Sequence, residues 1–249
     1  MSKTLIAGFW GLLSGSALVL GAGIACFFQV PQRAIAAVMA FGSGVLISAL
    51  SFELMEEAFS GGGIWPATGG FLAGAAMYTL ANVAVTRRGG HDRKRSRGRQ
   101  QHVHEGAGLG IAVGALLDGI PESIVIGVSL IGGESVSFVA VAAVFLSNLP
   151  EGLSSAAGMR KAGRSVGYVF GVWTFIALCC AVGAMIGYRA FAGAPPEYVA
   201  TANAVAAGAI LAMIADTMIP EAFETVQEYA GLVTVAGFLA AFTLSKLAG

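Results

Sequence analysis

Three acidic side chains lie inside two long apolar stretches of the sequence. Asp118 and Glu122 are four residues apart, so a helix places both on one face. Glu151 lies at the matching depth of the next apolar stretch, and no Lys or Arg occurs between Glu105 and Met159. A charged side chain at the centre of a bilayer costs about 2.5–3.5 kcal/mol on insertion scales. We therefore expect proton uptake or a bound cation to neutralise these carboxylates.

The two acidic segments repeat one pattern with a proline at its centre. Asp-Gly-Ile-Pro-Glu-Ser at 118–123 matches Ser-Asn-Leu-Pro-Glu-Gly at 147–152. Proline cannot donate to the carbonyl four residues earlier, so each segment leaves a carbonyl oxygen available at membrane depth. Irregular backbone is tolerated there only where it is buried or lines a cavity. The pattern predicts a cation site formed by Asp118, Glu122, Ser147, Asn148 and Glu151.

The composition places these segments in a membrane protein. Of 249 residues, 56% are hydrophobic and only 11% are charged, with a mean hydropathy of +0.78, whereas an average soluble domain is about 25% charged. This excludes a disordered chain, a disulfide-rich secreted scaffold and a soluble globular protein. Fourteen basic residues balance fourteen acidic ones, so the charge indicates no nucleic-acid partner. We expect an all-α integral membrane protein surrounded by a lipid bilayer.

Eight segments are long and apolar enough to cross a membrane, which takes roughly 20 residues. Glycine, proline and basic residues mark the breaks between them. We interpret residues 1–249 as a single transmembrane domain. The predicted spans are 4–28, 34–57, 64–86, 107–131, 136–159, 165–190, 198–219 and 230–248.

The distribution of basic residues orients the spans. The loop at 87–105 carries seven Lys and Arg residues, and cytoplasmic loops are enriched in these residues. Alternating spans then place eleven basic residues inside, against Lys3, Arg189 and Lys246 outside. Both termini should therefore face out, which agrees with an even number of spans.

A second internal sequence repeat relates residues 44–59 to residues 208–223, and both segments end in Glu-Ala-Phe. They belong to the second and seventh predicted spans. These spans cross in opposite directions, as the inverted repeats of transporters do.

The segments at 118–123 and 147–152 resemble the paired His-Asn-x-Pro-Glu-Gly-type motifs of the ZIP family of divalent-metal transporters, including its bacterial zinc-uptake branch. The likeness extends to eight helices, outward-facing termini, a basic loop after the third helix and a 3 + 2 + 3 inverted arrangement. The resemblance implies a transporter in the bacterial plasma membrane that imports zinc.

The resemblance also implies roles for the five site residues. Asp118 and Glu122 fall on the fourth-helix ligand positions, and Ser147, Asn148 and Glu151 on those of the fifth helix. Glu122 and Glu151 would bridge a two-metal site. The metal is the transported ion, and no separate cofactor is expected.

Three departures from the family pattern affect the choice of metal. Asp118 and Ser147 stand where the family usually has histidine or another strong ligand, and Gly119 replaces a ligating asparagine. No carboxylate occurs within 165–190. Because imidazole suits zinc while carboxylate and carbonyl oxygens suit harder ions, iron(II) and manganese(II) remain alternatives to zinc.

Four further acids lie near the ends of the second and seventh spans. Glu53 and Glu57 are expected at the outer face, and Asp216 and Glu221 at the inner face. They are interpreted either as vestibules that concentrate cations or as interfacial carboxylates in water.

The three histidines all lie outside the predicted spans. His102 and His104 could hold a metal weakly on the cytoplasmic side, although two ligands do not complete a zinc site; the other interpretation is a mobile linker. A metal-dependent hydrolase would need histidine ligands at the membrane centre, so no enzyme is expected. Two alternatives stay open: a metal-sensing homologue that does not transport, and a proton-coupled carrier of a small organic cation. A homodimer is compatible with the sequence.

Overall fold

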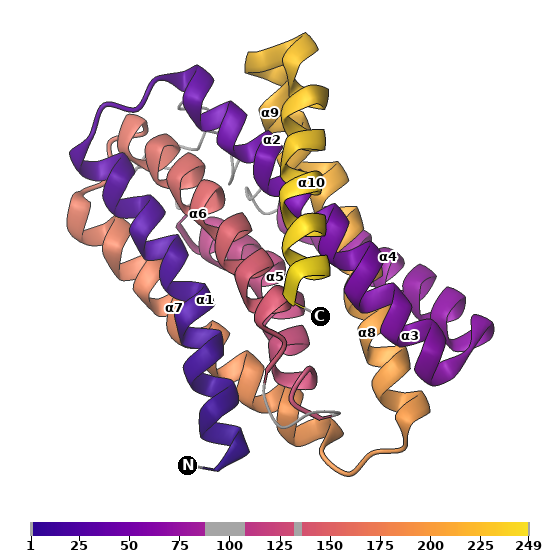
Figure 1. Cartoon of the computed structure of the whole chain (residues 1–249). Coiled ribbons are helices and arrows are strands. Elements are labelled where there is room, and N and C mark those ends of the chain that lie inside the picture. The colour runs from indigo at the N-terminus through magenta and orange to yellow at the C-terminus, as the bar shows by residue number, and fades with distance from the viewer. Residues whose placement is uncertain (1, 88–107, 132–135, 249) are drawn as a thin grey trace.

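The computed structural model describes residues 2–87, 108–131 and 136–248 (Figure 1). Every regular element in this part of the chain is helical, so the all-α prediction is confirmed. Six of the helices are long and apolar enough to cross a membrane, which indicates a multi-pass membrane protein. The elements are α1 (Lys3–Phe27), α2 (Gln32–Ala49), η1 (Leu50–Leu54), α3 (Met55–Gly62), α4 (Ile64–Val85), α5 (Gly108–Val128), α6 (Phe138–Lys161), α7 (Val166–Phe191), α8 (Pro196–Met213), η4 (Ile214–Met218), α9 (Ile219–Val226), η5 (Gln227–Tyr229) and α10 (Ala230–Ala248).

The eight predicted spans do not map one to one onto these six helices. The last of the six, Pro196–Leu247, covers the span predicted at 198–219 and, except for its last residue, the span predicted at 230–248. The chain nevertheless reverses within it, because Gln227 has a positive φ of 43°, and α10 then runs back beside α2 (Figure 1). The span predicted at 107–131 corresponds to α5, which is not among the six.

Short polar caps and glycine turns fix where several helices begin. The Ser137 hydroxyl accepts a hydrogen bond from the Ala140 amide at the start of α6, and Ser165 does the same for Tyr168 at the start of α7. Such caps satisfy amides that have no partner within the helix. Gly63, with a φ of 75°, makes the turn from α3 into α4, a conformation that favours glycine.

Glycine contacts bring α5 and α6 against the helices that flank them. A Cβ on Gly152 of α6 would collide with the Leu18 carbonyl of α1, and one on Gly127 of α5 would collide with the Ala184 carbonyl of α7. Close approach of backbones through small residues is the usual way that membrane helices pack. The two helices with the repeated Pro-Glu pattern are therefore held firmly by α1 and α7.

Two stretches of the chain repeat the same succession of elements. The run α2–η1–α3 has helices of 18, 5 and 8 residues, and α8–η4–α9 has the same three lengths. The segments 44–59 and 208–223 lie at equivalent places in these runs. Their packing also matches: Gly44 of α2 contacts the backbone of Thr234 in α10, and Gly208 of α8 contacts the backbone of Phe71 in α4.

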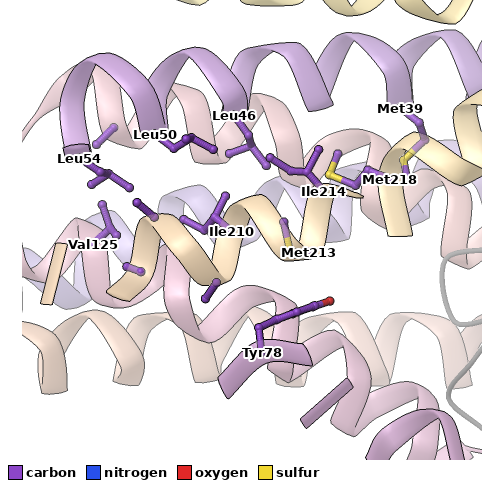
Figure 2. Close-up of a cluster of buried hydrophobic side chains, with 14 of the residues drawn as sticks. Met39, Leu46, Leu50, Leu54, Tyr78, Val125, Ile210, Met213, Ile214 and Met218 are labelled. Carbon is purple, nitrogen blue, oxygen red and sulfur yellow. The ribbon is translucent and has the colours of Figure 1, made fainter. Parts of the chain in front are cut away.

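The largest apolar cluster lies between these two runs (Figure 2). Leu46, Leu50 and Leu54 line one side of it, and Met213 and Ile214 line the other. Both π-helical turns, η1 and η4, contribute to the cluster, so the core holds the two repeated runs together.

Candidate functional site

All five residues of the predicted cation site are buried in the helical bundle. Asp118 and Glu122 lie on α5, and Ser147, Asn148 and Glu151 lie on α6; none is more than 3% exposed. Pro121 and Pro150 sit inside these helices, as their sequence pattern predicts. A polar layer therefore crosses the apolar interior on two neighbouring helices.

Asp118 is held by a tyrosine that the sequence analysis did not identify. The Tyr78 hydroxyl of α4 donates a hydrogen bond of 2.6 Å to Oδ1 of Asp118, and both side chains are buried. This distance lies within the ordinary range for an O–H···O hydrogen bond. Tyr78 is itself a member of the apolar cluster that contains Met213 (Figure 2). The only indication in the sequence that Tyr78 could belong to the site is its position within the predicted span 64–86.

We expect Tyr78→Phe to destabilise the protein by about 1–3 kcal/mol, because it removes a donor from a buried carboxylate. Thermal unfolding of the purified chain in detergent measures this. Tyr198→Phe is the matched control, since Tyr198 is 63% exposed. Equal shifts for the two variants would contradict a structural role for this hydrogen bond.

The polar residues of α6 point to more than one neighbour. The Asn148 side-chain amide donates to the Ser14 carbonyl of α1 at 3.1 Å, and the Ser147 hydroxyl donates to the Val144 carbonyl of its own helix at 2.9 Å. Within the described ranges, Oδ1 of Asn148 has no hydrogen-bond partner. Asn148 is thus anchored to α1 and keeps an acceptor atom in the interior.

A cysteine of α7 packs against α5 close to its Pro-Glu segment. Cys180 is buried, and a Cβ on Gly119 of α5 would lie 3.4 Å from its sulfur. Ser123 is its hydrogen-bonding neighbour, and Glu122 and Glu151 are both within electrostatic range of the thiol. The sequence analysis gives Cys180 no role in the site. Its position in the middle of the predicted span 165–190 could have indicated that it lies at the depth of the buried carboxylates.

The structure does not assemble the carboxylates into a closed metal centre. Among the residues that it describes, no three His, Cys, Asp or Glu side chains are grouped closely enough to hold a metal ion. Asp118 meets Tyr78 of α4, whereas Glu122 lies near Cys180 of α7. The four-residue spacing sets the shared helix face, but it does not determine which neighbouring helix each side chain approaches.

Two of the predicted vestibule acids lie in the π-helical turns. Glu53 in η1 accepts a hydrogen bond of 2.5 Å from the Ser245 hydroxyl of α10, and Asp216 in η4 accepts one of 3.2 Å from the Asn82 amide of α4. The two bonds link equivalent pairs of helices. π-helical turns occur frequently at functional sites.

The other two vestibule acids differ in exposure. Glu57 of α3 is exposed at a cavity and accepts a hydrogen bond from the Asn203 amide of α8 at 2.9 Å. Glu221 of α9 is only 2% exposed and lies 3.4 Å from the Ser154 hydroxyl of α6, which donates to it. Of the two acids expected at the inner face, Glu221 is therefore the buried one and Asp216 is exposed.

The predicted cytoplasmic metal ligands His102 and His104 lie outside the described residues, as does the basic loop at 87–105 apart from Arg87. A scan against models of protein families and a search of the curated proteins found no match to this chain. Function is therefore argued from the residues of the site, since a fold alone does not determine one.

Proposed function

We propose that this chain transports a divalent metal cation, zinc with iron(II) and manganese(II) as alternatives, into the cell across the bacterial plasma membrane. The observation that carries the proposal is the buried, twice-repeated Pro-Glu pattern of α5 and α6, with Asp118, Glu122 and Glu151 nearly inaccessible. Ionisable residues inside a membrane mark ion or substrate pathways by default.

Within the described residues, neither α5 nor α6 places a basic side chain in this layer. In α6 the basic residues are Arg160 and Lys161, which lie exposed in its last turn, and the described part of α5 has none. A buried charge is tolerated when it is paired. A divalent ion that gives up its water to Glu122 and Glu151 brings positive charge to these carboxylates as it passes.

The proposed architecture has eight spans in a 3 + 2 + 3 order, with α5 and α6 between two inverted repeats. The equal lengths in α2–η1–α3 and α8–η4–α9 support it, as do the matching contacts of Gly44 and Gly208. Inverted repeats with interrupted helices at their interface are common in secondary transporters. The positive-inside rule places both termini outside.

Uptake into vesicles tests the proposal. The purified full chain is reconstituted, and accumulation of radioactive zinc, iron(II) and manganese(II) is compared with that in protein-free vesicles. We expect saturable accumulation of at least one metal. Wild-type protein that moves none of the three would overturn the proposal, and binding without accumulation would instead support the metal-sensing alternative.

A further inference from the structure

A cavity of about 800 Å³ with a mixed polar and apolar lining opens at one end of the bundle, away from the buried carboxylates of α5 and α6. It lies among the ends of α3 and α5, the turn between α7 and α8, and the first half of α8. None of its described lining residues is Lys, Arg or His. Its polar lining consists of Glu57, Ser129, Ser137 and Asn203.

Glu57 is the single charged group on the described wall of this cavity, and a buried amide fixes its position. Asn203 is only 4% exposed and donates to Oε2 of Glu57 at 2.9 Å. A carboxylate that accepts one hydrogen bond keeps capacity for further donors or a cation. Glu53, one helical turn earlier, is directed instead toward Ser245 of α10.

We propose that this cavity is a docking site for a hydrated divalent cation, with Glu57 as its charged group and Asn203 as the residue that positions Glu57. Six waters occupy roughly 180 Å³ at about 30 Å³ each, so the cavity accommodates the ion with its hydration shell. A cleft lined by one sign of charge raises the local concentration of counter-ions. The class of cation rests on the proposed function.

The equivalent carboxylate in the run α8–η4–α9 is buried, and this explains why docking occurs at the end of the bundle that carries Glu57. Glu221 occupies in α9 the position that Glu57 occupies in α3, but it is buried against Ser154 of α6. An ion from solvent therefore reaches Glu57 directly, whereas Glu221 becomes accessible only after helices move.

Glu57→Gln should raise the half-saturating metal concentration in vesicle uptake roughly 3- to 10-fold and leave the maximal rate within about twofold, because it removes binding that precedes translocation. Glu56→Gln is the matched control: it deletes the same charge from the adjacent exposed residue, which does not line the cavity. Identical behaviour of the two variants would overturn the inference.

Asn203→Ala tests the positioning role. It should raise the half-saturating concentration by less than Glu57→Gln does. Combining both substitutions should add nothing to Glu57→Gln, since residues that act as a unit are not additive. Full additivity would show that Asn203 does not act through Glu57.

A binding measurement separates this inference from the transport proposal. The chain used carries Asp118→Asn, Glu122→Gln and Glu151→Gln. Binding of Mn²⁺ is followed in electron paramagnetic resonance by the loss of the signal of the free ion, and we expect one weak site. Adding Glu57→Gln should abolish this site, whereas adding Glu56→Gln should retain it. Such a site in a protein that moves no metal would leave the inference standing and refute only transport. If this chain fails to fold, the same titration is made with Glu57→Gln and Glu56→Gln alone. Wild-type transport without Glu57-dependent binding would refute the inference only.

Discussion

Replacing Glu151 or Glu122 by glutamine should reduce the maximal rate of metal uptake at least about 100-fold. The amide keeps the shape of the side chain but removes one of the charges that replace the hydration shell of the ion. A charge left uncompensated at the bilayer centre costs about 2.5–3.5 kcal/mol, which corresponds to a factor of roughly 100 or more. Initial rates in vesicles over a range of metal concentrations measure the change.

The same substitutions should leave folding intact or improve it. Burial of an ionised carboxylate is costly, and Glu151 is 3% exposed and Glu122 1% exposed. The metal-free variants should therefore unfold in detergent at the wild-type temperature or above it. Glu228→Gln, at an exposed position of η5, is the control for loss of one negative charge. Wild-type uptake by both Glu122→Gln and Glu151→Gln would refute the site assignment.

The lengths of the apolar stretches in the sequence predict most of the helices, but they do not predict the path of the chain from one helix to the next. The span predicted at 34–57 corresponds to a helical run that extends from Gln32 to Gly62 and contains the π-helical turn η1. A π-helical turn contains about one residue more than an α-helical turn, and the hydropathy of the sequence does not reveal this difference. Similarly, Gln227 reverses the chain through a backbone angle within a continuous helical stretch. The sequence predicts a break between residues 219 and 230, but it does not identify the residue at which the chain turns.

The buried acids could be predicted because charge in an apolar stretch is conspicuous, whereas their neighbours could not. Tyr78 and Cys180 are compatible with ordinary core positions. The hydrogen bond from Tyr78 to Asp118, and the placement of Cys180 within electrostatic range of Glu122, arise from packing between different helices. Asn148 is directed toward Ser14 because α6 lies against α1. The two hydrogen bonds join residues that are 40 positions apart (Tyr78 and Asp118) and 134 positions apart (Asn148 and Ser14), so they follow from the packing of helices against one another.

Gly44→Ala and Gly208→Ala should each destabilise the protein strongly. The added methyl carbon would collide with the Thr234 carbonyl of α10 in one variant and with the Phe71 carbonyl of α4 in the other. These atoms belong to helix backbone and cannot turn aside as a side chain can, so the helices must separate. Overpacking of this kind costs about 1–3 kcal/mol and sometimes more. Thermal unfolding in detergent and the yield of monodisperse protein measure the loss.

Gly69→Ala provides the control within α4, because its new methyl group meets nothing within 4 Å. Alanine is favoured over glycine in a helix by about 1 kcal/mol, so this variant should be as stable as wild type or slightly more stable. If Gly44 and Gly208 make equivalent contacts in two repeats, their alanine variants should lose similar amounts of stability. A large loss at one position with none at the other would contradict that equivalence, and with it the packing support for the inverted arrangement around α5 and α6.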